Sequence, residues 1–151
     1  MPPDSFFARI VRVSWPSLVV LVPLACRDPN AVKWAILPGA VVYGSAGPSV
    51  SIAQPIVTGQ AAVVTVYTFG DGCARQANTQ STVSGSIAVI EPFDWVVVQT
   101  PSNFACDQML NTFPHSVSLV FSQSGPATIR VLGRKVPFDT ADTLEYSVSV
   151  Q

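Results

Sequence analysis

Gly70-Asp71-Gly72-Cys73 is the stretch that decides the fold, together with Cys106 further along the chain. Glycine and aspartate are typical of tight turns, and runs rich in valine, serine and threonine lie before, between and after the two cysteines. This pattern predicts one disulfide, between Cys73 and Cys106, that cross-links the middle of an all-β domain. Closing a loop of this length stabilises a fold by about 3 to 4 kcal/mol.

Composition narrows the class of protein. The chain has 151 residues, enough for one domain and an additional segment, and 48% of them are hydrophobic while only 11% are charged. This is more apolar than a typical cytosolic domain, so part of the chain is expected to be deeply buried or directed to a membrane. The net charge of −1 and the scattered lysines and arginines argue against nucleic-acid binding.

Proline and glycine recur along the whole chain. There are 13 prolines and 9 glycines, and they leave no interval long enough for a sustained helix. The intervals are dominated by residues with high β propensity. We therefore expect an all-β fold.

Residues 1–25 are predicted to be an export signal. Arg9 and Arg12 precede an apolar run that ends before Cys26, and the run is shorter than the roughly 20 apolar residues that span a bilayer. A cysteine directly after a small residue resembles a bacterial lipoprotein signal, which implies lipidation of Cys26. Pro23 stands where leucine is usual in that pattern, so a plain signal peptide or an uncleaved anchor is the alternative.

The cysteine count agrees with export. Three cysteines in an oxidising compartment leave one without a partner, and lipidation of Cys26 would account for it. Cys73 and Cys106 are then the remaining pair. A metal site is the weaker interpretation, since there is no Cys-x-x-Cys motif and His115 is the only histidine. No cofactor is expected.

Residues 26–40 are predicted to be a linker and residues 41–151 the folded domain. The strongest strand, Ala61 to Phe69, is apolar on both faces, which is typical of a central strand covered on both sides. Pro92 is expected to end the strand that begins at Ile87. Asp107 is expected to cap a single helical turn, because Pro114 prevents a longer helix.

The last third of the chain has the clearest alternation of apolar and polar residues. Three runs alternate: 116–121, 127–131 and 144–150. Consecutive half-buried strands separated by turns predict an antiparallel sheet with one solvated face. With the earlier runs, about seven short strands predict a single immunoglobulin-like antiparallel β-sandwich.

The chain also resembles a group of uncharacterised bacterial lipoproteins from about Val41 onward. The segments that carry the resemblance are Thr68–Cys73, Ala88–Asp94, Ala105–Asp107, Phe113–His115 and Gly125–Arg134. The resemblance implies a lipoprotein-type export signal and one immunoglobulin-like domain. It implies no activity.

Few residues are candidates for chemistry or binding. His115 has no nucleophile motif near it, which favours a structural role over a catalytic one. Asp71, Asp94 and Asp107 could offer oxygens to calcium, although aspartate beside glycine is also typical of turns. Phe93, Trp95 and Phe104 are candidates for an exposed aromatic surface that binds a ligand, or else for the core.

These observations predict a noncatalytic binding or interaction module, exported and either lipid-anchored in the cell envelope or extracellular. Its partners would be the membrane, through the lipid anchor, and an unidentified protein or glycan. Two alternatives remain open. One is a small periplasmic enzyme or enzyme-accessory domain that uses His115, and the other is a structural subunit of a surface polymer that donates a strand to its neighbour.

Overall fold

The computed structural model describes residues 31–43, 50–136 and 139–151. The predicted signal, residues 1–25, and Cys26 lie outside these residues. The described residues form nine strands: β1 (Lys33–Pro38), β2 (Ala40–Tyr43), β3 (Val50–Ile52), β4 (Ala61–Gly70), β5 (Arg75–Ser84), β6 (Ile87–Gln99), β7 (Asn111–Val120), β8 (Gly125–Val136) and β9 (Thr140–Val150). This part of the chain contains no helix, as the composition predicts, and so no helix that could cross a membrane.

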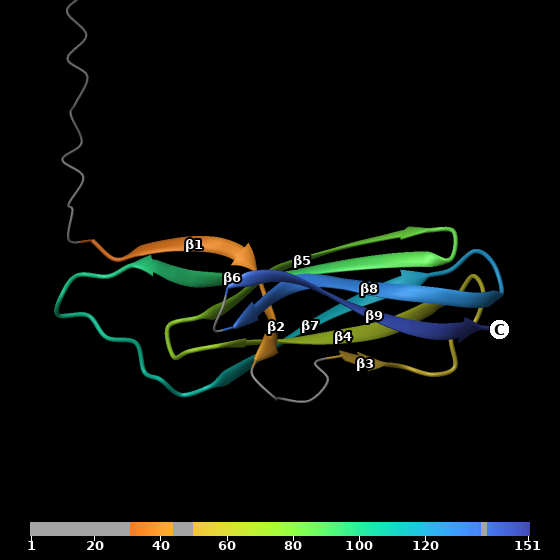
Figure 1. The fold of residues 1–151 in the computed structure, drawn as a ribbon. Coiled ribbons are helices and arrows are strands. Elements are labelled where there is room, and N and C mark those ends of the chain that lie inside the picture. The colour runs from red at the N-terminus through yellow and green to blue at the C-terminus, as the bar shows by residue number, and fades with distance from the viewer. Residues whose placement is uncertain (1–30, 44–49, 137–138) are drawn as a thin grey trace, which may run out of the picture.

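The strands belong to one strongly curled sheet whose two halves face each other (Figure 1). In one half, β4 pairs with β7 along one edge and with β3 along the other. In the other half, β6 pairs with β5 and with β8, and β8 pairs with β9. Strand β2 connects the halves, because it pairs with both β4 and β8.

The core lies between the two halves. Alternate residues of β4 point inward, among them Val64 and Val66, and they pack with Ile90 of β6 and Ile129 of β8 in one buried apolar cluster. Phe121, just beyond β7, is the largest fully buried side chain. Burying such side chains is the main favourable contribution to folding.

Two glycines lie in turns between strands. Gly85, with φ of 59°, lies in the tight turn between β5 and β6, and Gly125, with φ of 118°, begins β8. Both angles lie in the left-handed region, which glycine adopts without steric cost. The predicted hairpin of the last two alternating runs is confirmed as β8 and β9, paired antiparallel.

Other expectations differ from the structure. There are nine strands rather than about seven, and β7 pairs with β4 instead of joining β8 and β9 in a consecutive antiparallel sheet. Strands β6 and β8 are parallel neighbours. Alternation shows which residues share a face but not which strands are neighbours, so it could not exclude these pairings.

Strand β4 is central, but only one of its faces is covered. Val63 is 48% exposed and Tyr67 is 38% exposed, although both were expected to be buried. A half-curled sheet has a concave face that packs and a convex face that meets solvent. The valine-rich composition of β4 reflects strand propensity as well as burial.

The local structure at Pro92 and at Asp107 also differs from the prediction. Strand β6 continues through Pro92 to Gln99, because Pro92 lies opposite an irregularity in β5, where its missing N–H breaks no regular ladder. Residues 101–110 contain no helical turn; instead, Asp107 Oδ1 accepts a hydrogen bond from the Met109 amide at 3.2 Å.

The segment predicted as a linker contributes strands to the sheet. Strand β1 pairs with β6 from Lys33 to Pro38, so the sheet includes residues before Val41. Gly39 then lets the chain pass between the halves, since a Cβ there would lie 2.3 Å from Thr68 Cγ2 and 3.0 Å from Asp94 Oδ2. Pro38 and Gly39 therefore lie where the chain crosses from one half of the sheet to the other.

Candidate functional site

The disulfide between Cys73 and Cys106 is confirmed. The Cα atoms of the two cysteines are 5.3 Å apart, and the bond ties the turn after β4 to the loop before β7. Asp71 orders this turn: its Oδ1 accepts hydrogen bonds from the amides of Cys73 and Ala74 at 2.9 and 3.0 Å. The Gly72 amide donates to the Asp107 carbonyl across the bridge at 2.8 Å.

The three aspartates considered for calcium do not converge on one site. Asp71 and Asp107 use carboxylate oxygens to hold backbone amides, and Asp94 is buried beside His115. Among the described residues, one group has the spacing of metal ligands, and it consists of Asp71, Cys73 and Cys106. The sulfur atoms of that group are bonded to each other and are not available as thiolates.

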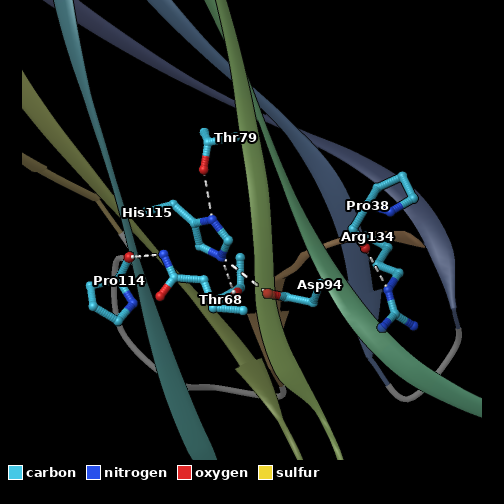
Figure 2. Close-up of polar contacts among 8 residues, drawn as sticks. Pro38, Thr68, Thr79, Asp94, Pro114, His115 and Arg134 are labelled. Carbon is cyan, nitrogen blue, oxygen red and sulfur yellow. Dashed lines mark hydrogen bonds and ion pairs between the residues drawn. The ribbon is translucent and has the colours of Figure 1, made fainter. Parts of the chain in front are cut away.

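His115 is at the centre of a buried polar network (Figure 2). Its Nε2 lies 3.1 Å from Asp94 Oδ1 and 3.1 Å from Thr68 Oγ1, and its Nδ1 lies 2.7 Å from Thr79 Oγ1. A carboxylate only accepts hydrogen bonds, so Nε2–H donates to Asp94, and Nδ1 shares a hydrogen bond with the Thr79 hydroxyl. The four side chains come from β4, β5, β6 and β7, and the network therefore ties both halves of the sheet together.

A hydroxyl, an imidazole and a carboxylate in series are also the components of a nucleophile relay. Here His115 and Asp94 are 0% and 1% exposed, and none of the four side chains lines either of the surface hollows described below. Asp94 Oδ2 is buried without a hydrogen-bond partner. The geometry is that of a structural network inside the protein.

The half-buried Trp34 and the exposed Arg75 and Trp95 form a surface on the outer face of β1, β5 and β6, which we call the aromatic platform. Arg75 lies directly opposite Trp95 across the β5–β6 ladder, and its guanidinium carbon is 4.8 Å from the centre of the Trp34 ring. Trp95 is 40% exposed. With Gln76, these residues line an open hollow of about 500 Å³.

The three aromatic residues predicted for binding are not equivalent in the structure. Trp95 belongs to the aromatic platform, and Phe93 is half-buried on the same strand, opposite Pro38. Phe104 is exposed in the loop that carries Cys106, and no ring contact joins it to the other two in the part of the chain that the structure describes. The predicted set therefore divides between two locations.

Trp34 and Arg75 were missed as candidates. Trp34 stands in the segment interpreted as a linker, and Arg75 in one interpreted as a polar connection. Their proximity depends on β1 and β5 pairing with opposite edges of β6. The short apolar run Trp34-Ala35-Ile36-Leu37, bounded by Lys33 and Pro38, was the available signal for a strand.

A second hollow, of about 470 Å³, lies near the disulfide. Apolar and aromatic side chains from five strands, β1, β2, β4, β6 and β8, and from the 108–110 loop line it, including Leu37, Phe69 and Met109. Arg134 closes one side: its Nε donates to the Pro38 carbonyl at 2.7 Å, and its Nη1 pairs with Asp139 (Figure 2 shows the bond to Pro38). The charged groups of Arg134 and Asp139 in this hollow are thus already paired with each other.

Comparison with family models, with curated proteins and with solved structures finds no match to the chain.

Proposed function

We propose that this protein is a noncatalytic binding module whose ligand surface is the aromatic platform. The observation that carries the proposal is the stacking of Arg75 over Trp34 beside the exposed ring of Trp95. Indole rings offer flat apolar surface that loses little conformational entropy on binding. The surface faces solvent on paired strands, which hold the rings in place.

An acidic glycan is the ligand class that this surface fits best. Sugar rings present flat C–H faces that can stack on the exposed ring of Trp95, beside the Trp34 ring that Arg75 covers. The contact with Trp34 occupies the face of the Arg75 guanidinium and leaves N–H donors at its edge free for a carboxylate. Bidentate pairing between arginine and a carboxylate gives geometric specificity as well as energy.

Catalysis receives no support from His115. Its ring nitrogens are engaged by Thr79, Thr68 and Asp94, and its side chain is fully buried. A general base must reach the proton it removes from a substrate, and a ring enclosed by four strands has no such access.

Export, lipid anchoring through Cys26 and membership of an envelope lipoprotein family belong to the same proposal. The Cys73–Cys106 disulfide supports them, since structural disulfides persist in oxidising compartments. The two facing halves of the sheet support an immunoglobulin-like sandwich as the nearest familiar architecture. The parallel pairs β6–β8 and β2–β8 are where the chain departs from it.

Isothermal titration with acidic and neutral oligosaccharides tests the ligand class. We expect binding of uronate oligomers, a loss of at least tenfold in affinity for Trp95→Ala, and a loss for Arg75→Gln that is specific to the acidic series. Tyr67→Ala, an equally exposed aromatic on β4, is the matched control and should bind as the wild type does. Equal affinities for wild type and Trp95→Ala, or no binding of any acidic oligosaccharide, would refute the proposal.

A further inference from the structure

The loop that leads into β7 is fixed at its N-terminal end to the turn that follows β4. Cys106 is bonded to Cys73, and the carbonyl of the next residue, Asp107, accepts a hydrogen bond from the Gly72 amide at 2.8 Å. The two backbones approach closely here, since a Cβ on Gly72 would lie 2.7 Å from Asp107 Cβ and 3.1 Å from its carbonyl oxygen. A disulfide and a backbone hydrogen bond on adjacent residues leave this end of the loop little freedom to move.

The C-terminal end of the loop is fixed to the same turn. Asn111 is the first residue of β7 and pairs with Gly70, the last residue of β4. The Asn111 side chain adds a second contact, because its Nδ2 donates a hydrogen bond to the Asp71 carbonyl at 3.3 Å. Both ends of the loop are therefore attached to the four consecutive residues 70–73.

Gln108, Met109 and Leu110 lie between the fixed ends and are exposed. Met109 is 61% exposed, the highest fraction among the large hydrophobic residues of the described ranges, and Leu110 is 49% exposed. The backbone makes neither a turn nor a bend from residue 104 to residue 110, and no strand pairs with it. The chain thus presents a short extended segment with two apolar side chains at the surface.

This form matches what an endopeptidase binds. Proteases hold a substrate as an extended strand and place one side chain in a specificity pocket, which is a hydrophobic slot in chymotrypsin and contains an aspartate in trypsin. Residues 106–111 contain no lysine and no arginine. Met109 has an unbranched, flexible and apolar side chain, so it suits the hydrophobic slot and not the acidic pocket.

We propose that this loop occupies the active site of a serine endopeptidase with an apolar specificity pocket and inhibits it. Met109 enters the pocket, and the Met109–Leu110 peptide bond lies where a substrate is cut. Because the loop is already held at both ends, binding orders few additional torsions and costs little conformational entropy. Protease–inhibitor complexes are among the tightest known, and their interface backbones move little on binding.

The same attachments make the loop an inhibitor and not a substrate. Hydrolysis adds water to the Met109–Leu110 bond and leaves a carboxylate on Met109 and an amino group on Leu110. The Met109 side remains attached to the domain through Cys106 and Cys73, and the Leu110 side through Asn111 of β7. The two new ends therefore cannot move apart, and the bond can form again with the release of water.

Exposed apolar side chains beside the loop enlarge the contact surface. Val98, near the end of β6, is 55% exposed and lines the hollow near the disulfide together with Met109. Phe104, in the same loop before Cys106, is 36% exposed. None of the residues that line this hollow belongs to the aromatic platform, so the two surfaces can be tested separately.

Inhibition of peptide hydrolysis tests the proposal. The oxidised wild type should compete with a small chromogenic peptide substrate for chymotrypsin and should not inhibit trypsin. Met109→Lys should weaken the inhibition of chymotrypsin by about tenfold or more and create inhibition of trypsin. Val120→Lys, at a 49% exposed position at the other end of β7, is the matched control and should behave as the wild type does. A wild type that does not inhibit chymotrypsin, or a Met109→Lys variant that does not inhibit trypsin, would overturn the proposal.

Mass spectrometry distinguishes an inhibitor from a substrate. With a trace of chymotrypsin, the wild type should reach a constant mixture of intact protein and protein cut between Met109 and Leu110, and this mixture should still inhibit. Asn111→Ala removes one attachment, so it should be cut faster and inhibit more weakly, while its urea-unfolding midpoint stays close to that of the wild type. Asn103→Ala, at an exposed asparagine earlier in the same loop, is the matched control. Complete hydrolysis of the wild type at this bond, with loss of inhibition, would reject the proposal.

Discussion

Breaking the buried pair of Asp94 and His115 should destabilise the fold more than any exposed ion pair. In His115→Ala the Asp94 carboxylate loses its hydrogen-bond donor at 3.1 Å while it remains buried, and its second oxygen already has no partner. Leaving a buried charge without its partner costs about 3 to 5 kcal/mol. This is a fifth or more of the stability of a typical domain, about 5 to 15 kcal/mol.

Asp94→Ala should cost less, about 1 to 3 kcal/mol, because Nε2–H of His115 still has the Thr68 hydroxyl at 3.1 Å. The double variant removes both groups, so its cost should be smaller than the sum of the single costs by about 1 kcal/mol or more. Urea unfolding followed by tryptophan fluorescence measures all three free energies, with unchanged m-values as the condition for comparing them.

The Arg130–Glu145 pair is the control, since it has a similar distance, 2.8 Å, but side chains that are 45% and 55% exposed. Its removal should cost at most about 1 kcal/mol. If the stability costs of His115→Ala and Asp94→Ala add up to the cost of the double variant, the reasoning is refuted. A His115→Ala protein that unfolds like wild type but has lost an enzymatic activity would also refute it, because that result would make His115 catalytic.

Two further predictions concern the cysteines. Under oxidising conditions, Cys73→Ser should lower the free energy of unfolding by about 3 to 4 kcal/mol, and its stability should be close to that of the reduced wild type. Denaturant unfolding with and without reductant measures both differences. Two alkylatable thiols at Cys73 and Cys106 in the unreduced, denatured protein would contradict the prediction. If Cys26 is lipidated as proposed, Cys26→Ala should release the protein from the membrane fraction, because an acylated terminus supplies membrane affinity. Mass spectrometry that finds a mature N-terminus other than Cys26 would reject lipidation.

Local features of the fold could be predicted from the sequence. The disulfide, the turn at Gly85 and the hairpin of β8 and β9 depend on residue types and on short separations along the chain. The glycines mark left-handed conformations, and the alternating runs identify the inner face of each strand. These properties are encoded within a few neighbouring residues.

The pairing of distant strands could not be predicted in the same way. Strand β7 has equally good alternation for a place beside β8 and for its observed place beside β4. Gly39 was interpreted as part of a linker, whereas its lack of a side chain is what allows β1 and β2 to cross between Thr68 and Asp94. The neighbours that give such a residue its role are far away in the sequence.

The candidate site could be predicted from the sequence only in part, for the same reason. Trp95 and His115 were recognisable as unusual residues, but Trp34, Arg75, Thr68 and Thr79 acquire their roles only when strands from separate parts of the chain are aligned. A threonine in a strand is ordinary in sequence. Thr68 and Thr79 become partners of His115 only because the register of the strands places them beside its ring.

The position of β2 also orders the assembly of the protein in time. This short strand pairs with β4 and with β8, and β8 is among the last strands to be synthesised. The turn and loop joined by Cys73 and Cys106 can be cross-linked before β8 exists, but the two halves cannot be closed by β2 until then. A fold that depends on such distant pairings belongs to the class that folds in milliseconds to seconds. During that interval β2 and the edge of β6 that pairs with β8 lack their final partner, which is when the chain is most open to binding by chaperones.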